Sequence, residues 1–433
     1  MIVDHLTDLI GRTPMLRLKG EVHGIRGLDV YLKLEMLNPF GSIKDRTAWA
    51  LLRDEIESVA RDKKTIFETS SGNTAKAIAG IASAYGVATR LVSAPLRSEG
   101  QKRGLLQMGV EIEEISGAND CFDPNNQSDP QYLIERAVAA NPDKIYFPGQ
   151  FKNKKNVQVH YDDTGAEIIS DLGGVDYFFG GMGTIGSSAG IAKKLREVNR
   201  AVVVVGVCAQ RGHSIPGIRE QDMLAGSPLY EAETYQEILS VKDTAAIEGM
   251  IHLNRTVGLM CGPSTGASYS ALVEYFSCHP VPEGMQKKAV MIACDRYEPY
   301  LDYVRDRRPD VYREKYQVGS FFTYDVESEI EEIAPADFSG WVAENHPLII
   351  DMRAPMAYGL ARVRGAINIP LQQLEMLLQQ GDIFPKEQPV VLMCAVGERS
   401  RRHVSYLSSR GYRALGVRGG VQALVDYPDC LVR

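Results

Sequence analysis

The chain has 433 residues, of which 44% are hydrophobic and 24% charged, and its formal net charge is −7. This length predicts two or three domains with hydrophobic cores, and the negative charge argues against nucleic acid as the main partner. No apolar run approaches the ~20 residues that span a bilayer. The seven cysteines form no CxxC pair and the histidines form no HxxH pair, so we expect a cytoplasmic protein with reduced thiols and no metal site.

Apolar runs typical of strands alternate with longer helix-like segments between residue 28 and about residue 300. Strands separated by helical spacers favour a largely parallel sheet with helices on both faces. Ligands are then expected at the loops that follow the carboxyl ends of the strands. The strand-like runs are 30–34, 65–68, 89–93, 177–179, 202–207 and 289–293.

The alternation stops near the charged stretch 305–310, and a shorter α/β pattern follows it. In this second pattern, strand-like runs at 348–351, 390–393 and 414–417 alternate with helix-like segments at 371–380 and 400–410. We therefore predict a first domain over residues 1–316, a linker over 317–326 and a small α/β domain over 327–433.

Lys44 stands where the first strand-like run gives way to a Pro/Gly turn and then a helix, in the stretch NPFGSIKDR at 38–46. A lysine at such a junction can project into a cleft, where partial desolvation makes its amine easier to deprotonate and able to form a Schiff base. The ordinary alternative is a solvated lysine at a helix start. Only the motifs further along the chain weigh against that alternative.

Two loops of small residues also join a strand-like run to a helix. The stretch SSGNT at 70–74 offers hydroxyls and backbone N–H groups at a helix start, an arrangement suited to a carboxylate. The stretch GPSTGA at 262–267 is a second turn of this kind. Taken alone, the first loop is better explained as a simple N-cap, and the second is equally well explained as a tight structural turn.

The glycine-rich stretch GGMGTIG at 180–186 follows a strand-like run and opens a helix. Its glycines let the backbone approach a phosphate closely. The stretch also contains GxGxxG, the dinucleotide fingerprint, which requires an acidic residue ~20 residues further on, after the next strand. That strand ends in VGVCAQ at 205–210 without one, so a monophosphate is favoured over NAD.

The order of these motifs resembles the fold-type II pyridoxal phosphate (PLP) enzymes of the cysteine synthase/cystathionine β-synthase family. The lysine turn, the SSGNT loop, the glycine loop and the Gly-x-Ser turn follow one another as in that family. The stretch IGRTP at 10–14 is similar to the family's opening signature, and the resemblance extends from about Leu6 to Leu301. It implies two subdomains, each a parallel sheet between helical layers, and a homodimer.

The resemblance also implies a role for each matching residue. Lys44 would hold PLP as a Schiff base and Asn73 would bind the ring hydroxyl oxygen. Ser264 would face the pyridine nitrogen. The phosphate would lie against Gly180, Gly181, Gly183 and Thr184, and the substrate carboxylate against Ser70, Ser71, Thr74 and Gln150.

A serine opposite the ring nitrogen suits elimination at the β-carbon of an amino acid. Unlike a carboxylate, Ser264 does not stabilise a pyridinium, so a long-lived carbanion is disfavoured. Loss of the β leaving group then accompanies transfer of the α-proton to Lys44, the general base. The product of this step is an electrophile for an incoming sulfur nucleophile.

Two departures from the family pattern concern the leaving group and the phosphate. Gly181 and Met182 stand where Thr and Gly are common, so one hydroxyl contact is lost and Met182 must point away from the cofactor. Arg219, in HSIPGIR at 213–219, replaces a usual glycine of the substrate-gating segment. An arginine there would meet an anionic leaving group, which makes O-phosphoserine a candidate beside the default O-acetylserine. An exposed Arg219 without any role is the alternative.

The motif of the second domain is the loop CAVGERS, which follows the strand-like run 390–393 and precedes a helix. The sulfur of Cys394 would face backbone N–H groups and a helix N-terminus, which stabilise a thiolate or a persulfide anion. Four residues separate Cys394 from Arg399, one fewer than in the phosphatase loop CX5R, so the loop suits a single sulfur better than a phosphate. The predicted persulfide loop consists of Cys394, Ala395, Val396, Gly397, Glu398 and Arg399.

This region resembles the rhodanese family from about Glu327 to Arg433. The stretches IIDMR at 349–353 and RGAINIP at 364–370 and the late Gly419-Gly420 support the resemblance. The other cysteines are expected to pack in cores or strands.

The two resemblances together predict a fused enzyme that forms cysteine or a related amino acid from an activated serine. Its sulfur would come from sulfide, thiosulfate or a persulfide by way of Cys394. Two alternatives stay open. Cysteine could instead be broken down at the PLP site, with the rhodanese domain accepting the released sulfur, or the rhodanese domain could sense sulfur and regulate the PLP enzyme.

Overall fold

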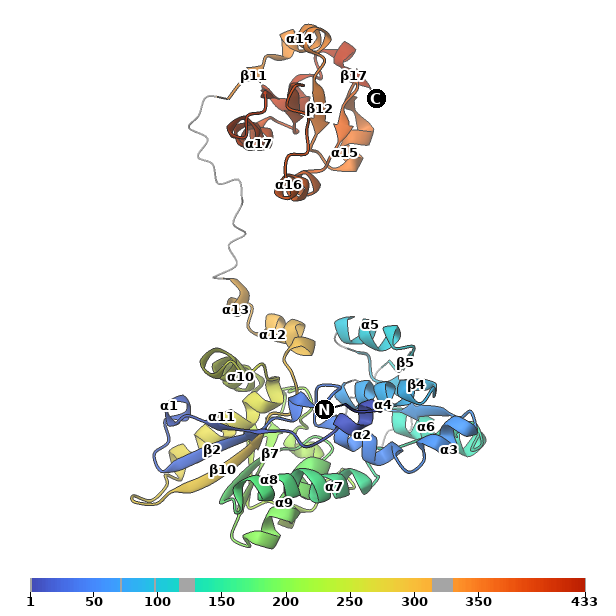
Figure 1. Cartoon of the computed structure of the whole chain (residues 1–433), viewed down its shortest axis with the longest axis vertical. Coiled ribbons are helices and arrows are strands. Elements are labelled where there is room, and N and C mark those ends of the chain that lie inside the picture. The colour runs from blue at the N-terminus through green and yellow to red at the C-terminus, as the bar shows by residue number, and fades with distance from the viewer. Residues whose placement is uncertain (1, 71, 97–98, 117–128, 314–329, 433) are drawn as a thin grey trace. The chain divides into compact units, whose positions relative to one another are not determined.

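The computed structural model describes residues 2–70, 72–96, 99–116, 129–313 and 330–432, which form two compact units, Met1–Arg313 and Glu314–Arg433 (Figure 1). Residues 314–329 lie outside the described residues. The predicted domain end at residue 316, the linker 317–326 and the domain start at 327 fall in that range and stay predictions.

A six-stranded sheet forms the larger half of the first unit, in the order β1-β2-β10-β7-β8-β9. All neighbouring strands are parallel except β1 and β2, which are antiparallel. The carboxyl ends of the parallel strands, and the loops that follow them, therefore lie at the same edge of the sheet. The strands are β1 (Met15–Leu18), β2 (Leu28–Lys33), β7 (Tyr177–Gly181), β8 (Val203–Ala209), β9 (Glu237–Val241) and β10 (Lys287–Ile292).

Helices cover both faces of this sheet (Figure 1), and a separate hydrophobic core lies between each face and its helices. One core packs α10 (Asp243–Val257) and α11 (Pro263–Cys278) against the sheet, with α1 (Gly20–His23) beside them. The other packs α8 (Ala166–Leu172) and α9 (Gly186–Val198). The central strands β7, β8 and β10 are largely buried on both sides, which explains their apolar runs.

A parallel four-stranded sheet in the order β5-β4-β3-β6 forms the smaller half of the first unit. Its strands are β3 (Thr65–Glu68), β4 (Thr89–Ser93), β5 (Glu111–Glu114) and β6 (Ile145–Tyr146). The surrounding helices are α2 (Lys44–Leu52), α3 (Ile56–Arg61), α4 (Asn73–Ala84), α5 (Glu99–Gln107), α6 (Pro130–Ala140) and α7 (Lys155–Val159). A π-helical segment, His160–Gly165, leads from α7 into α8, and α12 (Leu301–Arg307) and α13 (Asp310–Arg313) end the unit.

The second unit is a parallel five-stranded sheet in the order β11-β16-β15-β12-β14. Its strands are β11 (Glu332–Ile333), β12 (Leu348–Asp351), β14 (Ile367–Asn368), β15 (Val390–Met393) and β16 (Ala414–Val417), and a separate pair joins β13 (Arg362–Val363) to β17 (Leu431–Val432). Helices α16 (Leu371–Gln380) and α17 (Glu398–Ser409) share one core. Helices α14 (Phe338–Asn345) and α18 (Gly420–Ala423) share the other, and α15 (Pro355–Leu360) follows β12.

The predicted α/β architecture is confirmed, and the strands predicted at 65–68, 89–93, 348–351, 390–393 and 414–417 have these same bounds. The apolar pattern missed β5, whose sequence EIEE is mostly exposed, and the short β6. Strand β7 runs two residues further than predicted, because Gly180 and Gly181 pair with Gly206 and Val207 of β8.

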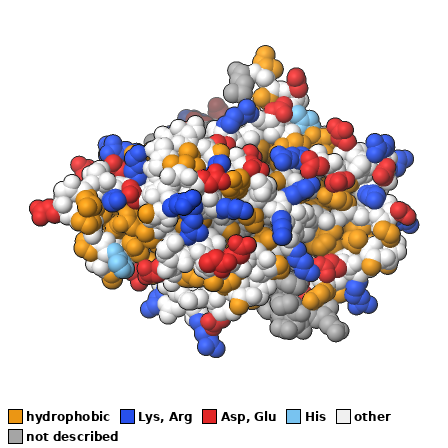
Figure 2. Space-filling view, turned by 90° about the horizontal axis from the view of Figure 1, so that it is seen from below, with side chains coloured by type: hydrophobic (Ala, Val, Ile, Leu, Met, Phe, Trp, Pro, Cys, Tyr) orange, Lys and Arg blue, Asp and Glu red, His pale blue; other side chains and the backbone are white. Residues whose placement is uncertain are grey.

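The surface and the cysteines add three observations. On the face shown in Figure 2, positive and negative side chains are interspersed. Within the described part of the chain, no helix is long and apolar enough to cross a membrane. The six described cysteines are free, and Cys278 is exposed, so the expectation that the other cysteines are interior is wrong for this residue; Cys121 lies outside the described residues.

Candidate functional site

Lys44 is the first residue of α2, and the turn before it is attached to the segment that follows β10. Ile43 N–H donates to the carbonyl of Cys294 at 2.9 Å, and Ser42 forms a backbone bridge with Asp295. Asp45 is fully buried and accepts the N–H of Phe40 at 2.6 Å. The lysine turn is thus held between the two halves of the first unit, at the carboxyl end of β10.

The environment of Lys44 favours a neutral amine. Burial lowers the pKa of Lys44, and the nearby Cys294 and Asp295 oppose this shift without reversing it. Burial also raises the pKa of Asp295 to about 6 and that of Cys294 to about 12. A neutral amine is the form that reacts with an aldehyde or accepts a proton, so the predicted chemistry of Lys44 is compatible with its surroundings.

Asn73, the first residue of α4, meets a buried acid that the sequence analysis did not single out. Its side-chain amide donates to Asp295 at 2.6 Å and to the Tyr300 hydroxyl at 3.1 Å. The Tyr300 hydroxyl donates to the same carboxylate oxygen at 2.5 Å. Asp295 directly follows Cys294 at the carboxyl end of a predicted strand, and this position was the signal that could have identified it.

Two of the predicted carboxylate-binding residues contact each other. The Thr74 hydroxyl donates to Gln150 Oε1 at 2.7 Å, and the Gln150 side-chain amide donates to the carbonyl of Thr69 at 2.9 Å. The Ser70 hydroxyl accepts the N–H groups of Gly72 and Ala75, both at 3.3 Å. The structure therefore brings Thr74 and Gln150 together beside the start of α4, whereas Ser71 lies outside the described residues.

Glu68, at the end of β3, is a buried carboxyl behind this loop. It accepts the N–H groups of Thr69 at 2.9 Å, Gly149 at 3.0 Å and Gln150 at 3.4 Å. Burial nevertheless dominates and raises the pKa of Glu68 to about 8. Glu68 thus connects the SSGNT loop with the segment that carries Gln150.

The glycine loop at 180–186 has a backbone that leaves little room for side chains. A Cβ at Gly183 would lie 2.3 Å from the carbonyl oxygen of Gly217. Ile185 precedes α9 with φ +75°, a left-handed conformation that is strained for a β-branched residue and typical of functional sites. Met182 is fully buried, with its sulfur 3.6 Å from Cys208 Sγ, so its side chain packs into the core.

Asn156 joins three parts of the site through its buried side chain. Its amide donates to the carbonyl of Gln150 at 2.9 Å and to the Thr184 hydroxyl at 3.0 Å. Its oxygen accepts the Thr47 hydroxyl of α2 at 3.1 Å. The helix that begins with Lys44, the Gln150 segment and the phosphate loop therefore share one hydrogen-bonded side chain.

Arg219 is buried, not exposed as the alternative for this residue supposed. Only 1% of it is exposed, and its Nε donates to the carbonyl of Gly183 at 2.8 Å. A second guanidinium nitrogen lies 3.4 Å from the carbonyl of Met223. The arginine thus supports the glycine loop from behind while placing a positive charge next to it.

The predicted residues of the first unit have the groups needed to hold PLP. Lys44 would supply the amine, and the Gly183 backbone and the Thr184 hydroxyl, which accepts a hydrogen bond from Asn156, would face the phosphate. Ser264 is nearly buried near the start of α11, beside Cys294. A hydroxyl, not a carboxylate, is therefore available for the ring nitrogen.

In the second unit, Cys394 lies between β15 and α17 and is 5% exposed. The carbonyls of Cys394 and Ala395 accept the N–H groups of Val421 and Gln422, both at 3.0 Å. Because a trans peptide directs its N–H opposite to its C=O, the N–H groups of Ala395 and Val396 point away from α18. A Cβ at Gly420 would lie 2.4 Å from the Cys394 carbonyl oxygen, which explains the late glycine pair.

The cysteine opens into a cavity of about 420 Å³. Ser400 is buried with its hydroxyl 3.6 Å from Cys394 Sγ. The cavity is lined by Met352, Arg353, Ala354, Ala357, Leu371, Cys394, Ala395, Val396, Glu398 and Arg399. All members of the predicted persulfide loop except Gly397 line this cavity.

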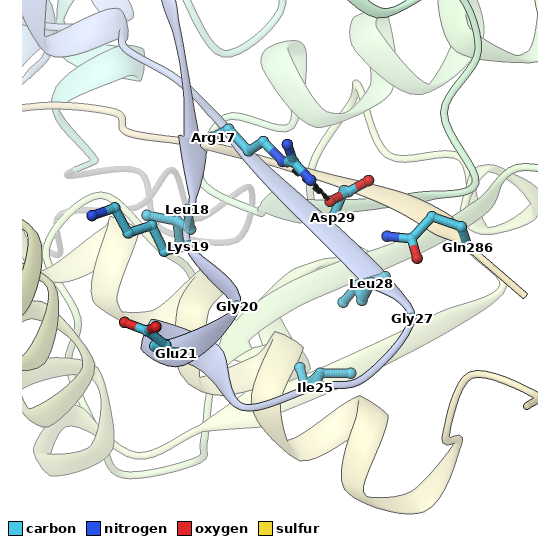
Figure 3. Close-up of a pocket in the computed structure, with 10 residues that line it drawn as sticks. All are labelled: Arg17, Leu18, Lys19, Gly20, Glu21, Ile25, Gly27, Leu28, Asp29 and Gln286. Atoms are coloured by element: carbon cyan, nitrogen blue, oxygen red, sulfur yellow. Dashed lines mark hydrogen bonds and ion pairs between the residues drawn. The ribbon is translucent and has the colours of Figure 1, made fainter. Parts of the chain in front are cut away.

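A larger cavity of about 560 Å³ lies by β1, α1 and β2 (Figure 3). Arg17 and Asp29 form an ion pair in its wall. The described residues that line it include no cysteine, histidine or serine and none of the predicted site residues. Among the described residues, no group of His, Cys, Asp and Glu side chains is placed to hold a metal ion.

Comparisons with known proteins match the two units to two families. The family described as "Pyridoxal-phosphate dependent enzyme" matches residues 6–295, and "Rhodanese-like domain" matches residues 334–426. Cysteine synthase B of Pseudomonas aeruginosa is 30% identical over 304 residues, which are 68% of this chain and 95% of that protein.

Two solved structures are similar to the first unit. The O-acetylserine dependent cystathionine β-synthase of Helicobacter pylori has a TM-score of 0.61 at 27% identity and covers 70% of this chain and 98% of its own. A hydrogen sulfide-producing enzyme of Fusobacterium nucleatum has a TM-score of 0.60 at 28% identity, and the match covers 70% of this chain and 99% of that one.

Proposed function

The chain belongs to the pyridoxal-phosphate dependent enzymes and carries a rhodanese-like domain, and we propose that it replaces the β-substituent of an activated serine with sulfur. The product would be cysteine or a related amino acid. Two observations carry this proposal, in a unit similar to cysteine synthase B. Lys44 and Asn73 both lie near Asp295, and Thr74, which follows Asn73, contacts Gln150.

The cofactor is PLP, which when bound withdraws electrons from the α-carbon of an amino acid and so labilises the α-proton and the β leaving group. Lys44, Asn73 and Ser264 would hold its reactive part, and Gly180, Gly181, Gly183 and Thr184 its phosphate. Lys44 has the lowered pKa that a base for the α-proton needs. Thr74 and Gln150 would orient the substrate carboxylate, with Ser70 and Ser71 beside them.

The activated serine is O-acetylserine or O-phosphoserine. Arg219 places a buried positive charge behind the glycine loop, and such a charge favours an anionic leaving group. We expect Arg219→Ala to lower turnover of O-phosphoserine more than turnover of O-acetylserine, with Arg219→Lys intermediate. An unchanged donor preference in both variants would exclude this role.

The rhodanese-like unit would supply the sulfur as a persulfide on Cys394, either by direct attack on the electrophile or after reduction to sulfide. Both routes need an added thiol, which cleaves the S–S bond to Cys394 and is oxidised to a disulfide. The test is mass spectrometry of the products that the full-length protein with PLP forms from each serine ester and either sulfide or a sulfane-sulfur donor. We expect Cys394→Ser to abolish product formation from thiosulfate or a persulfide and to spare product formation from sulfide. Equal losses with both kinds of sulfur would refute the relay.

Cysteine breakdown is the second candidate function, because one structural neighbour is a hydrogen sulfide-producing enzyme. In that case the protein would release pyruvate, ammonia and sulfide from cysteine alone. Because sulfide is not a sulfane-sulfur donor, Cys394 would gain a persulfide from it only with an added two-electron oxidant. If the second unit instead acts only as a sulfur sensor, isotope-labelled sulfur would reach Cys394 and never the amino acid.

Two further expectations concern the state of the protein. We expect a homodimer, which size-exclusion chromatography with light scattering would test. We also expect a cytoplasmic location, because Cys394 can carry sulfur only if it starts as a free thiol.

A further inference from the structure

We propose that Cys394 takes its sulfur from an organic persulfide in preference to a small inorganic dianion such as thiosulfate. This inference rests on the proposed role of Cys394 as a sulfur carrier and names the class of its donor. It follows from the size, the apolar wall and the charge balance of the 420 Å³ cavity in front of the cysteine.

The wall of the cavity offers more apolar contact than a bare dianion can use. Met352, Ala354, Ala357, Leu371 and Val396 line it, together with the methyl group of Ala395. Leu371 and Ala357 come from α16 and α15, so this apolar wall extends beyond the cysteine loop itself. The carbon skeleton of an organic donor would bury apolar surface here, at about 25 cal/mol per Å², whereas thiosulfate has no such surface.

Carboxylates offset the two guanidinium groups of the wall. Arg353 forms an ion pair with the fully buried Asp351, whose oxygen lies 2.6 Å from its guanidinium nitrogen, and it also donates to the carbonyl of Ala361 at 2.6 Å. Arg399 is exposed and directly follows Glu398, which is also exposed and also lines the cavity. A dianion therefore finds one arginine that is already paired and another with an acid beside it.

The other arginines of this region do not line the cavity. Arg401 and Arg402 follow on α17 and Arg418 precedes the glycine pair, and all three are exposed. Arg401 lies 4.0 Å from Glu332. The remaining attraction for an anion is short-range and comes from the N–H groups of the loop and the N-terminus of α17, which suit a single charged sulfur.

The transfer balances without an oxidant or a reductant. The Cys394 thiolate attacks the outer sulfur of R–S–S⁻, the S–S bond of the donor breaks, and a new S–S bond forms on Cys394. The leaving thiolate R–S⁻ takes the electron pair of the broken bond. The sulfane sulfur keeps its oxidation state, so the donor thiolate and the enzyme persulfide are the only products.

The experiment measures how fast Cys394 gains one sulfur atom in the full-length protein, by rapid quench and intact mass. The probes are thiosulfate, a freshly prepared short-chain alkyl persulfide and a persulfidated cysteine on a small carrier protein. We expect at least one organic persulfide to react at least about tenfold faster than thiosulfate, a difference of about 1.4 kcal/mol in the barrier. The two organic probes show whether the donor is a free molecule or a protein-bound cysteine.

Two variants separate the charge argument from the apolar argument. Glu398→Gln removes an exposed carboxylate, so it should accelerate the dianionic thiosulfate several-fold more than the singly charged alkyl persulfide. Ala357→Phe fills the cavity, so it should slow the organic persulfides more than thiosulfate. Met356→Phe is the matched control, because Met356 lies on the same helix, is 81% exposed and does not line the cavity.

The possible outcomes distinguish this inference from the proposed function. If thiosulfate loads Cys394 as fast as both organic persulfides, or if Glu398→Gln leaves the ratio of rates unchanged, the inference is wrong while the sulfur relay can still stand. If an organic persulfide loads Cys394 fastest but no sulfur reaches the amino acid, the inference stands and the relay fails. Failure of every probe to load Cys394 would overturn both.

Discussion

The two units hold their reactive groups in different ways. In the first unit, Lys44 lies among side chains from many distant segments, and buried side-chain hydrogen bonds through Asn73, Asp295 and Asn156 connect them. In the second unit, Cys394 lies in one short loop that backbone hydrogen bonds from α18 hold in place. The first site depends on polar side chains that satisfy each other, and the second depends on the path of the backbone.

This difference determines where each site is sensitive to substitution. A buried side-chain network loses several interactions when one shared member is removed. A backbone loop tolerates many side-chain changes but not an atom placed where its carbonyls run. Four substitutions test this contrast.

Lys44→Ala should have the largest effect, because Lys44 is the only lysine of α2 and no other amine there can replace it. We expect activity to fall by roughly a thousandfold or more, since the variant loses both the cofactor anchor and the base. Borohydride reduction followed by peptide mapping should label Lys44 in the wild type and no lysine in the variant. Lys76→Ala, an exposed neighbour on α4, is the control and should keep both label and activity.

Gly420→Ala should damage the second site through the backbone alone. The added Cβ would lie 2.4 Å from the Cys394 carbonyl oxygen at a residue with φ +63°, so we expect a loss of about 2–3 kcal/mol in the stability of the second unit. Hydrogen exchange of the α17 amides in the full-length protein measures this loss. Gly359→Ala, where an added Cβ meets nothing within 4 Å, should be neutral or slightly stabilising. Similar effects of the two substitutions would contradict the backbone argument.

Asn156→Asp should damage the first site through the side-chain network. The variant loses the amide that donates to Gln150 and Thr184, so we expect PLP to bind roughly tenfold more weakly. Equilibrium titration of the cofactor, followed by its absorbance, measures this change. Asn199→Asp removes a comparable hydrogen bond, from the side-chain amide to the Val175 carbonyl, and should leave cofactor binding unaltered.

Glu68→Gln should have the smallest effect, on the pH dependence of stability. Burial raises the pKa of Glu68 from 4.5 to about 8, so the folded state binds the proton more tightly than the unfolded state does. The stability from this group is full below pH 4.5 and is lost progressively as the pH rises to about 8. Thermal midpoints across this range should fall less steeply in Glu68→Gln than in the wild type. Glu57→Gln, at an exposed glutamate, is the control. If Glu68→Gln changes the slope no more than this control does, the titration of Glu68 is not its cause.

Local sequence determined much of this architecture. Buried parallel strands such as β8 and β15 need continuous apolar runs, and turns that open helices need small residues, so both were visible in the chain. The lysine turn and the CAVGERS loop were visible for the same reason. Each is a short segment that carries its reactive residue within a recognisable local pattern.

Only the tertiary structure decided which side chains connect the parts of the first site. Thr47 and Asn156 are 109 residues apart in the chain, and Asn73 and Asp295 are 222 residues apart. No local pattern predicts such contacts, because they depend on how two sheets and their helices pack. The burial of Arg219 and the partners of Glu68 were hidden for this reason: burial and hydrogen-bond partners are properties of the packed chain.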